Sequence, residues 1–397
     1  MADNKQNKRP NVPPLRFPEF TEPWERKKLS NFTERVTRKN KGQTNLPLTI
    51  SAQYGLVDQI SFFNNKVASA DMSNYYLLKR GEFTYNKSYS SDYPLGAVKR
   101  LDLYDMGALS TLYICFKIAG DINSDYLVHY FESPKWHRGV YEIAGEGARN
   151  HGLLNIAVGD YFETQHYLPC SLKEQEKIAS MLNLIQRRIE VQSKLIEDLQ
   201  QLKSALVERQ YCQHNPNCRI GDLVVQVSKR NRGDNVYSVL SVNNRLGFIE
   251  QSEQFEDRSV ASDDTSNYKV VSRDDFAYNP ARVNVGSIAR LTSFESGIVS
   301  PMYICFHTKK QLFPQYLEHF FDTRYFHYEM QKRLEGSVRL CLSWEGLCNI
   351  PIAVPPIDQQ EKVGKRISRL ADKISLEERH LDLLKTQKQY LLQAMFI

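Results

Sequence analysis

A long helical pattern occurs twice in this amino-acid sequence and constrains the fold more than any other feature. Residues 168–210 and 354–396 carry apolar residues in alternating steps of four and three, the heptad spacing of helices that pack along a seam. Each apolar residue of the first copy lies 185 positions before its counterpart, and Gln192 and Glu377 interrupt the two series at the same place. The predicted helix-pairing residues are Ile178, Leu182, Ile185, Ile189, Ile196, Leu199 and Leu206 in the first copy, and Val363, Ile367, Leu370, Ile374, Leu381, Leu384 and Leu391 in the second. The chain is therefore a tandem duplication whose two helices are expected to bury against each other.

The lengths of the helices and of the segment between them favour antiparallel pairing. Each helix is expected to have about 38 residues, and hence a length of about 57 Å at 1.5 Å per residue. In a parallel pair, residues 210–219 would have to return along the first helix, but about ten residues reach only about 35 Å when fully extended. Antiparallel pairing needs no such return and places one globular domain at each end, unless the second domain itself reaches back along the helix.

The helical copies divide the chain into five parts. They are a flexible N-terminal tail (1–20), a first globular domain (21–168), a first spacer helix (169–210), a second globular domain (211–354) and a second spacer helix (355–397). The tail is polar and interrupted by prolines, so it cannot build a core, and it is expected to pack at most from Leu15 onward.

The two globular segments are also copies of each other. Residues 73–86 match residues 266–279 at an offset of 193 with seven identities, and the sequence YICF occurs at Tyr113 and at Tyr303. Glycine-bounded runs of β-branched and aromatic residues predict strands in both copies, and apolar residues at helical spacing predict helices after them. In the first copy the predicted strands are 83–85, 97–101 and 111–116, followed by a helix at 125–141 and a closing strand at 155–158. In the second copy the corresponding helix is predicted at 314–334 and the closing strand at 349–354. The expected fold class is α+β, with two similar mixed α/β domains joined by an antiparallel coiled coil in a pseudo-two-fold repeat.

Composition and cysteine usage exclude few classes of protein. The net charge of +6 favours a polyanionic partner, although many proteins without such a partner have a similar charge. Seven cysteines at irregular spacings argue against a disulfide framework. Cys212, His214 and Cys218 supply only three potential metal ligands and have no counterpart in the other copy, so no metal site is predicted. Nothing in the sequence resembles a signal peptide or a membrane span, which makes the cytoplasm the expected location.

No pattern in the sequence predicts a catalytic site. A phosphate-binding Gly-x-x-x-x-Gly-Lys-Ser/Thr loop, an HExxH motif and a convincing dinucleotide-binding glycine motif are all missing. Residues 278–281, Tyr-Asn-Pro-Ala, partly match the Asn-Pro-Pro-aromatic motif of adenine methyltransferases, but the second proline and the aromatic residue are absent. We interpret them as a turn that ends a strand, and we predict no catalytic residues.

Polar and basic side chains near the predicted strand ends form the candidate DNA interface. Asn and Gln can pair with adenine, Arg and Lys with guanine, and hydroxyl groups with phosphate; the alternative for any one of them is a polar loop residue that faces water. Arg149 and Arg339 follow glycine-rich turns, which more often have a structural role than a phosphate-binding one. The predicted DNA-binding residues are Tyr85, Asn86, Lys87, Ser88, Tyr89, Lys99, Arg100 and Arg149 in the first copy, and Tyr278, Asn279, Arg282, Asn284, Arg290 and Arg339 in the second.

The order domain, helix, domain, helix, together with several recurrent residues, resembles a known family. These residues are the opening Leu15, Arg16, Phe17, Pro18 and Trp24; Phe83 and Phe276; Ser110 and Ser300; Tyr126-Leu127 and Tyr316-Leu317; Pro169 with Glu174 and Gln175; and Pro355 and Pro356 with Gln359 and Gln360. Over nearly its whole length the chain resembles the specificity (S) subunit of type I restriction-modification systems, with two target recognition domains and two helical regions. Cys170 occupies the position where the family usually has a second proline, at the joint between domain and helix.

The resemblance implies a non-catalytic, cytoplasmic subunit of a host-defence complex. Each target recognition domain would read one half of a bipartite, asymmetric site in double-stranded DNA, and the helices would set the gap between the halves. Methyltransferase subunits would dock on the helices and modify adenine with S-adenosylmethionine, and a separate restriction and translocase subunit would use ATP and Mg²⁺. No cofactor is expected on this chain itself.

The sequence leaves two other classes of function open. The chain could be an unrecognised stand-alone DNA-modifying enzyme, which would show turnover without a partner. It could also be a coiled-coil adaptor without DNA readout of its own, which would show negligible DNA binding at low salt, because phosphate contacts weaken steeply with salt.

Overall fold

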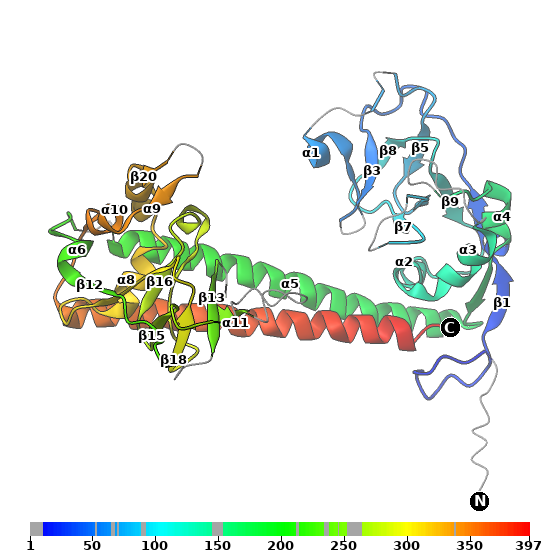
Figure 1. Ribbon diagram of the computed structural model, residues 1–397. Helices are drawn as coiled ribbons and strands as arrows, with labels where there is room; N and C mark the ends of the chain where they lie inside the picture. The colour runs from blue at the N-terminus through cyan, green and yellow to red at the C-terminus, as the bar shows by residue number, and fades with distance from the viewer. Residues whose placement is uncertain are drawn as a thin grey trace, which may run out of the picture. The chain divides into compact units, whose positions relative to one another are not determined.

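The chain folds into two compact units, each containing a mixed α/β domain and a part of both long helices (Figure 1). This computed structural model describes residues 11–51, 54–64, 68–69, 71–88, 93–144, 154–211, 214–233, 238–244, 246–251, 264–336 and 339–397. Unit 1 comprises Met1–Gln192 and His380–Ile397, and unit 2 comprises Ser193–Arg379. The boundary between the units therefore lies within both helices and not between a domain and its helix.

The two long helices are α5 (Leu172–Tyr211) and α11 (Ile357–Ala394), and they run antiparallel. In unit 1 the beginning of α5 packs with the end of α11, as Ile178 and Leu182 share a core with Leu391. In unit 2 the order is reversed, because Val207 near the end of α5 shares a core with Ile367 near the beginning of α11. The antiparallel coiled coil predicted from the sequence is therefore present. No helix among the described residues, these two included, is long and apolar enough to cross a membrane.

The seam positions are covered in both helices. Among the predicted pairing residues, Ile178, Leu182, Ile185, Ile196, Ile367, Ile374, Leu384 and Leu391 are buried, and Ile189, Leu199, Leu206, Val363, Leu370 and Leu381 are partly buried. The polar interruptions Gln192 and Glu377 are also covered, with 8% of each residue exposed. Lys373 forms an ion pair with Glu377 from the preceding turn of α11, which compensates part of the cost of burying that carboxylate.

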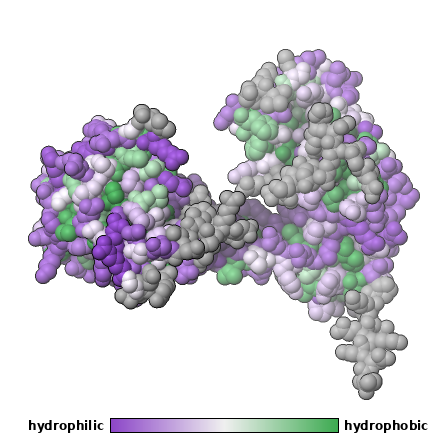
Figure 2. All heavy atoms as spheres, in the orientation of Figure 1, coloured by the Kyte–Doolittle hydropathy of each residue, from purple (hydrophilic) through white to green (hydrophobic). Residues whose placement is uncertain are grey.

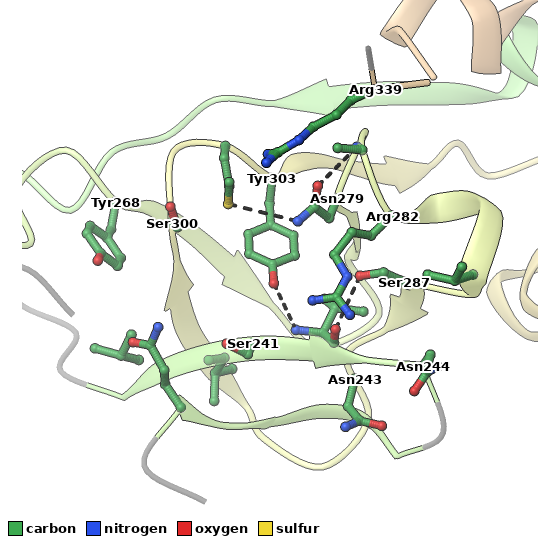
Figure 3. Close-up of a pocket in the computed structure, with 17 residues that line it drawn as sticks. Ser241, Asn243, Asn244, Tyr268, Asn279, Arg282, Ser287, Ser300, Tyr303 and Arg339 are labelled. Atoms are coloured by element: carbon green, nitrogen blue, oxygen red, sulfur yellow. Dashed lines mark hydrogen bonds between the residues drawn. The ribbon is translucent and has the colours of Figure 1, made fainter. Parts of the chain in front are cut away.

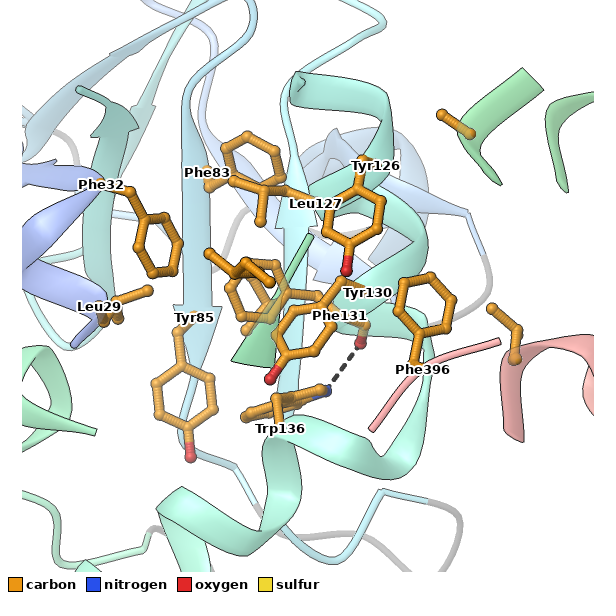
Figure 4. Close-up of a cluster of buried hydrophobic side chains, with 14 of the residues drawn as sticks. Leu29, Phe32, Phe83, Tyr85, Tyr126, Leu127, Tyr130, Phe131, Trp136 and Phe396 are labelled. Carbon is orange, nitrogen blue, oxygen red and sulfur yellow. Dashed lines mark hydrogen bonds between the residues drawn. The ribbon is translucent and has the colours of Figure 1, made fainter. Parts of the chain in front are cut away.

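The domain of unit 1 is built on a four-stranded antiparallel sheet in the order β2-β9-β6-β7. These strands are β2 (Thr33–Arg35), β9 (Ile114–Ile118), β6 (Phe83–Asn86) and β7 (Ala97–Arg100). Phe83 and Phe116 stack at 5.5 Å between ring centroids on neighbouring strands, and helix α2 (Ser124–Glu132) contributes Phe131 against both rings. Figure 4 shows this aromatic core, in which Trp136 donates a hydrogen bond of 2.9 Å to the carbonyl of Phe131.

The remaining strands of unit 1 form three two-stranded pairs. They are β3 (Leu48–Ser51) with β4 (Gly55–Asp58), β5 (Tyr76–Lys79) with β8 (Met106–Leu109), and β1 (Glu25–Lys28) with β10 (Gln165–Leu168). The pair β1-β10 joins the first strand of the domain to the strand that leads into α5.

Unit 2 repeats this architecture. Its central sheet has the order β12-β19-β16-β17, and a second sheet has the order β14-β13-β18-β15. The strands are β12 (Val224–Val227), β19 (Ile304–Thr308), β16 (Phe276–Tyr278), β17 (Ile288–Arg290), β14 (Gly247–Glu250), β13 (Val239–Asn243), β18 (Ser296–Val299), β15 (Lys269–Ser272), β20 (Leu334–Glu335), β21 (Cys341–Leu342), and β11 (Cys218–Arg219) paired with β22 (Pro351–Ile352). The helices are α6 (Ile220–Leu223), α8 (Pro314–Phe320), α9 (Arg324–Gln331) and α10 (Trp344–Cys348). Phe276 and Phe306 stack at 5.1 Å, as their counterparts do in unit 1.

The structure extends the repeat to a hairpin that sequence comparison had not matched. The hairpins β3-β4 and β13-β14 end in Gly-Leu-Val-Asp-Gln (55–59) and Gly-Phe-Ile-Glu-Gln (247–251). Gly55 and Gly247 both have positive φ angles, 80° and 70°, which glycine adopts without strain. In unit 2 the hairpin β13-β14 lines one hollow together with the predicted residues Asn279 and Arg282.

The ends of the long helices return to equivalent places in the two units. In unit 1, Phe396 after the end of α11 packs on Tyr126, with ring centroids 5.4 Å apart. In unit 2, Tyr211 at the end of α5 packs on Tyr316, with centroids 4.6 Å apart. Phe396 and Tyr211 are 185 positions apart, like the pairing residues. The C-terminus therefore completes the core of the first domain.

Three predictions about the fold need correction. Residues 125–141 form α2, the short η2 (Pro134–Trp136) and α3 (His137–Ile143), because Pro134 has no N–H to continue α2. The second predicted helix is likewise divided into α8 and α9 at Thr323, whose side chain caps α9 by accepting from the N–H of Phe326. Residues 155–158 do not form the closing strand; α4 (Val158–Glu163) begins there, and the strand is β10.

The N-terminal segment is docked on unit 1 from Leu15 onward. The N–H of Leu15 donates to the carbonyl of Ala394 at 2.9 Å, which ties this segment to the end of α11. Arg16 forms two hydrogen bonds, 2.6 and 2.8 Å long, with the buried Glu174 at the beginning of α5. Trp24 donates to the same carboxylate at 3.1 Å. The tail was expected to pack at most from Leu15 onward, and the contacts of Leu15 and Arg16 agree with that expectation. Residues 1–10 lie outside the described part of the chain.

Candidate nucleic-acid interface

The two predicted tyrosines at the strand ends belong to the cores and not to the surface. Tyr85 and Tyr278 are both fully buried. The hydroxyl of Tyr85 donates to the carbonyl of Leu95 at 2.8 Å, and that of Tyr278 donates to the carbonyl of Leu342 at 3.3 Å. Burial raises the pKa of both hydroxyl groups. Their prediction as DNA contacts is therefore wrong, because strand alternation places them inward.

The predicted arginines Arg100 and Arg290 are occupied by carboxylates. Arg100 donates to Asp102 and Asp125 at 2.7 Å each. Arg290 donates to Glu318 at 2.9 and 2.8 Å and also pairs with Asp274. In both units the arginine thus joins the edge strand of the central sheet to a helix, through Asp125 of α2 in unit 1 and Glu318 of α8 in unit 2. These two carboxylates are not at equivalent positions of the repeat. These arginines are structural links, and the structure corrects their prediction as DNA contacts.

The other predicted residues of unit 1 have mixed surroundings. The side chain of Asn86 accepts from the N–H of Ser88 at 3.0 Å and so forms a turn after β6. Lys87 is partly buried and donates to the carbonyl of Ile156 at 3.3 Å, and Ser88 is exposed. Lys99 is partly buried, and burial lowers its pKa. Tyr89 and Arg149 lie outside the described residues.

Three predicted residues of unit 2 line one hollow of about 710 Å³ (Figure 3). They are Asn279 after β16, Arg282 in the following turn and Arg339 before β21. Asn279 accepts from the N–H of Ala281 at 3.1 Å, which repeats the turn made by Asn86. Its amide nitrogen contacts the sulfur of Met302 at 3.9 Å, a weak interaction. Asn284 is exposed but does not line this hollow.

The rest of the hollow comes from residues that the sequence analysis did not select. Strand β13 supplies Ser241 and Asn243. Tyr303 directly precedes β19, and its hydroxyl accepts from the N–H of Val242 at 3.4 Å. Tyr268 and Tyr303 were visible as repeat identities, and that repetition is the signal that could have found them. Ser241 and Asn243 carried no such signal, because the match between the hairpins is apparent only from the structure.

The charge at the hollow suits an anionic ligand. Arg282 and Arg339 are exposed, and neither has an ion-pair partner among the described residues, whereas Arg290 nearby in sequence is neutralised. Exposed, uncompensated guanidinium groups bind phosphate in one or two hydrogen bonds. Amide, hydroxyl and aromatic groups below them are the kinds of side chain that contact base edges and stack on bases. In the described part of the chain, His, Cys, Asp and Glu form no group that could hold a metal ion.

The long helices leave apolar residues exposed at intervals of seven. In unit 1 these are Leu184 and Val191 on α5, and Leu383 and Tyr390 on α11; in unit 2 they are Leu195 and Leu202 on α5. Residues seven apart lie on nearly the same face of a helix. Hydrophilic residues otherwise cover much of the visible surface of each unit (Figure 2).

Solved structures share this fold, although comparisons of sequence alone find no match. No family model and no curated protein matches the chain. The S subunit of the type I restriction-modification (R-M) system from M. genitalium aligns with a TM-score of 0.59 and 14% identity, over 97% of this chain and 99% of its own. A chain of a type I R-M system, from a study of complex assembly and conformational transition, aligns with a TM-score of 0.56 and 12% identity, over 95% and 99%. At such low identity the likeness establishes the fold, which spans both units.

Proposed function

We propose that this chain is the specificity subunit of a type I restriction-modification complex and reads a bipartite, asymmetric site in double-stranded DNA. The observation that carries the proposal is the duplication of a complete unit, domain with helix, whose two copies keep the same strand order in the central sheet. Two domains with a common framework and different surface residues are suited to two different short sequences. The fold shared with S subunits supports the same conclusion.

Each globular domain acts as a target recognition domain for one half of the site. In unit 2 the hollow with Arg282 and Arg339 binds the DNA, with the guanidinium groups on phosphates and the polar groups beneath them on base edges. In unit 1 the equivalent surface follows β6, where Asn86, Lys87 and Ser88 lie. Phosphate contacts of this kind give affinity that falls steeply with salt.

The paired helices set the gap between the half-sites and dock the methyltransferase subunits. Exposed apolar residues seven positions apart, such as Leu383 and Tyr390, are typical of a helix face that takes a further helix. The docked subunits methylate adenine with S-adenosylmethionine, and a separate restriction and translocase subunit uses ATP and Mg²⁺. This chain is non-catalytic, binds no cofactor and works in the cytoplasm as part of a host-defence complex.

The proposal is tested by coexpressing the chain with its methyltransferase subunit and mapping adenine methylation across a host genome. We expect a motif of two short half-sites with a gap of fixed length. Exchanging residues 24–168 for those of another reader should then change one half-site only. A continuous motif would contradict the model of two readers. No methylation, with complex formation and an active partner demonstrated, would favour a coiled-coil adaptor, and turnover by the purified chain alone would favour a stand-alone enzyme.

A further inference from the structure

Two glutamines at equivalent positions of the repeat have a buried oxygen without a hydrogen-bond partner. Gln59 follows β4 in unit 1 and Gln251 follows β14 in unit 2, each four residues after the positive-φ glycine of its hairpin. The Oε1 atoms of both are buried and have no partner among the described residues. Buried polar atoms are paired in the great majority of cases, so the same exception at the same place in both copies requires an explanation.

The fold does not explain why these glutamines occur in both copies. Asn86 and Asn279 also occur in both, but each forms the same turn with the backbone two residues later. The amide oxygens of Gln59 and Gln251 form no such hydrogen bond. The residue that follows the glutamine also differs between the two copies, isoleucine in the first and serine in the second. A shared ligand contact accounts for a side chain that is repeated without a structural role.

The missing partner must be a hydrogen-bond donor, which limits the chemistry of the ligand. Phosphate oxygens are acceptors and cannot satisfy an amide oxygen. Among DNA groups, the exocyclic amino groups of bases are donors, and an amide pairs in two hydrogen bonds with adenine, accepting from N6 and donating to N7. An amide oxygen without a partner can also turn toward a ligand without breaking a hydrogen bond. Adenine is therefore the base that matches a glutamine in this state.

The position of Gln251 agrees with this chemistry. It lines the same hollow as Asn279, Arg282 and Arg339, so a base that enters the hollow meets an amide while its phosphates meet guanidinium groups. Gln59 occupies the matching position of the β3-β4 hairpin in unit 1.

We propose that Gln251 and Gln59 each read one adenine, at corresponding positions of the two half-sites. The inference rests on the proposed function and adds to it a base requirement that the two otherwise different readers share. The remaining polar groups around each glutamine then account for the differences between the half-sites.

Methylation mapping with single variants tests the assignment. Gln251→Met keeps the length of the side chain and removes both the oxygen and the nitrogen of its amide. We expect it to relax one adenine position in one half-site, with discrimination falling about tenfold to a hundredfold, the range for one bidentate base contact. Gln59→Met should relax one adenine position in the other half-site. The matched controls Gln226→Met and Gln43→Met, at exposed positions of units 2 and 1, should leave the motif unchanged.

A base analogue tests the same contact without a substitution in the protein. Purine in place of the adenine lacks the 6-amino group, so the wild-type complex should bind the modified DNA about tenfold or more weakly. The Gln251→Met complex should bind both DNAs equally. An unchanged motif in both variants, relaxation at a base other than adenine, or equal binding of both DNAs by the wild type would overturn the inference. If the wild type shows no split motif, the proposed function itself fails, which is a different result.

Discussion

Lys388 near the end of α11 donates a hydrogen bond of 2.8 Å to the carboxylate of Glu132 at the end of α2. In unit 2, Lys203 and Asp322 form the equivalent ion pair at 3.2 Å, and Lys203 lies 185 positions before Lys388. Near its end, each long helix is therefore attached by the same kind of pair, to the end of α2 in unit 1 and to the turn after α8 in unit 2. The attachment has survived the divergence of the two domains.

Loss of the Lys388 ammonium should destabilise unit 1, because it leaves Glu132 without its nearest cation. Burial raises the pKa of Glu132, but the hydrogen bond with His129 and the charges of Lys388 and Lys99 outweigh it and lower the pKa to about 2. We expect Lys388→Met to lower the free energy of unfolding by about 1–3 kcal/mol at pH 7. Lys385→Met, at an exposed position of the same helix, should change it by less than about 0.5 kcal/mol in urea unfolding. Equal effects would contradict a specific role of the pair.

Two buried tyrosines next to each other should respond oppositely to loss of the hydroxyl. The hydroxyl of Tyr126 is buried without a partner among the described residues, whereas that of Tyr130 is 2.8 Å from Nδ1 of His166. Tyr126→Phe should be neutral or stabilising by up to about 1 kcal/mol, because it removes an unpaired polar atom. Tyr130→Phe should cost about 1–2 kcal/mol, since it leaves His166 without a partner at Nδ1. Thermal unfolding of the two variants distinguishes these outcomes, and a larger loss for Tyr126→Phe would refute the assignment.

Mildly acidic conditions should destabilise both units through buried histidines. Burial lowers the pKa of His166 in unit 1 and of His319 in unit 2 to about 4, from 6.5 in an exposed histidine. Between these values the unfolded chain binds protons that the folded chain does not, so stability is complete above pH 6.5 and falls as the pH drops toward 4. The loss reaches at most about 3 kcal/mol per histidine. His319→Gln should reduce this pH dependence, whereas His214→Gln, at an exposed position, should leave it unchanged.

Removal of the helix-end aromatic rings should act on one unit at a time. Phe396 packs on Tyr126 and Tyr130 in unit 1, and Tyr211 packs on Tyr316 and Phe320 in unit 2. We expect each change to alanine to cost about 3–5 kcal/mol in the unit concerned. Hydrogen exchange should then accelerate in β6 for Phe396→Ala and in β16 for Tyr211→Ala. Faster exchange in both sheets for either variant would show that the units unfold together.

Arginines in unit 2 should separate into binding and structural groups. Arg282→Met should weaken DNA binding by the complex and reduce the salt dependence of log affinity by about one, as expected for one lost phosphate contact. Its effect on unfolding should be below about 0.5 kcal/mol, because the side chain is exposed. Arg290→Met should instead destabilise the unit by about 1–3 kcal/mol, since only 9% of its side chain is exposed and it pairs with Asp274 and Glu318. The reverse pattern would contradict the interface described above.

Periodicity in the sequence determined the duplication, the two long helices and the mixed domains, and the short segment 210–219 favoured antiparallel pairing of the helices. The physical reason is that heptad spacing and strand alternation are local consequences of burying one face, and a repeat 185 residues later supplies an independent copy of the same pattern. The helix breaks at Pro134 and Thr323 were also encoded locally, in a proline and a capping side chain.

Only the tertiary structure decided which polar residues near the strand ends are accessible. Tyr85 and Arg100 looked alike as recognition residues, yet one is in the core and the other is bound to Asp102 and Asp125. The partner of Tyr85 is a backbone carbonyl, and the partners of Arg100 are carboxylates. Whether these groups come close to the two side chains depends on how strands and helices pack. The same packing brings the β13-β14 hairpin beside Asn279 and places Gln251 in the hollow. Contacts between distant segments determine such neighbourhoods, and no local pattern records them.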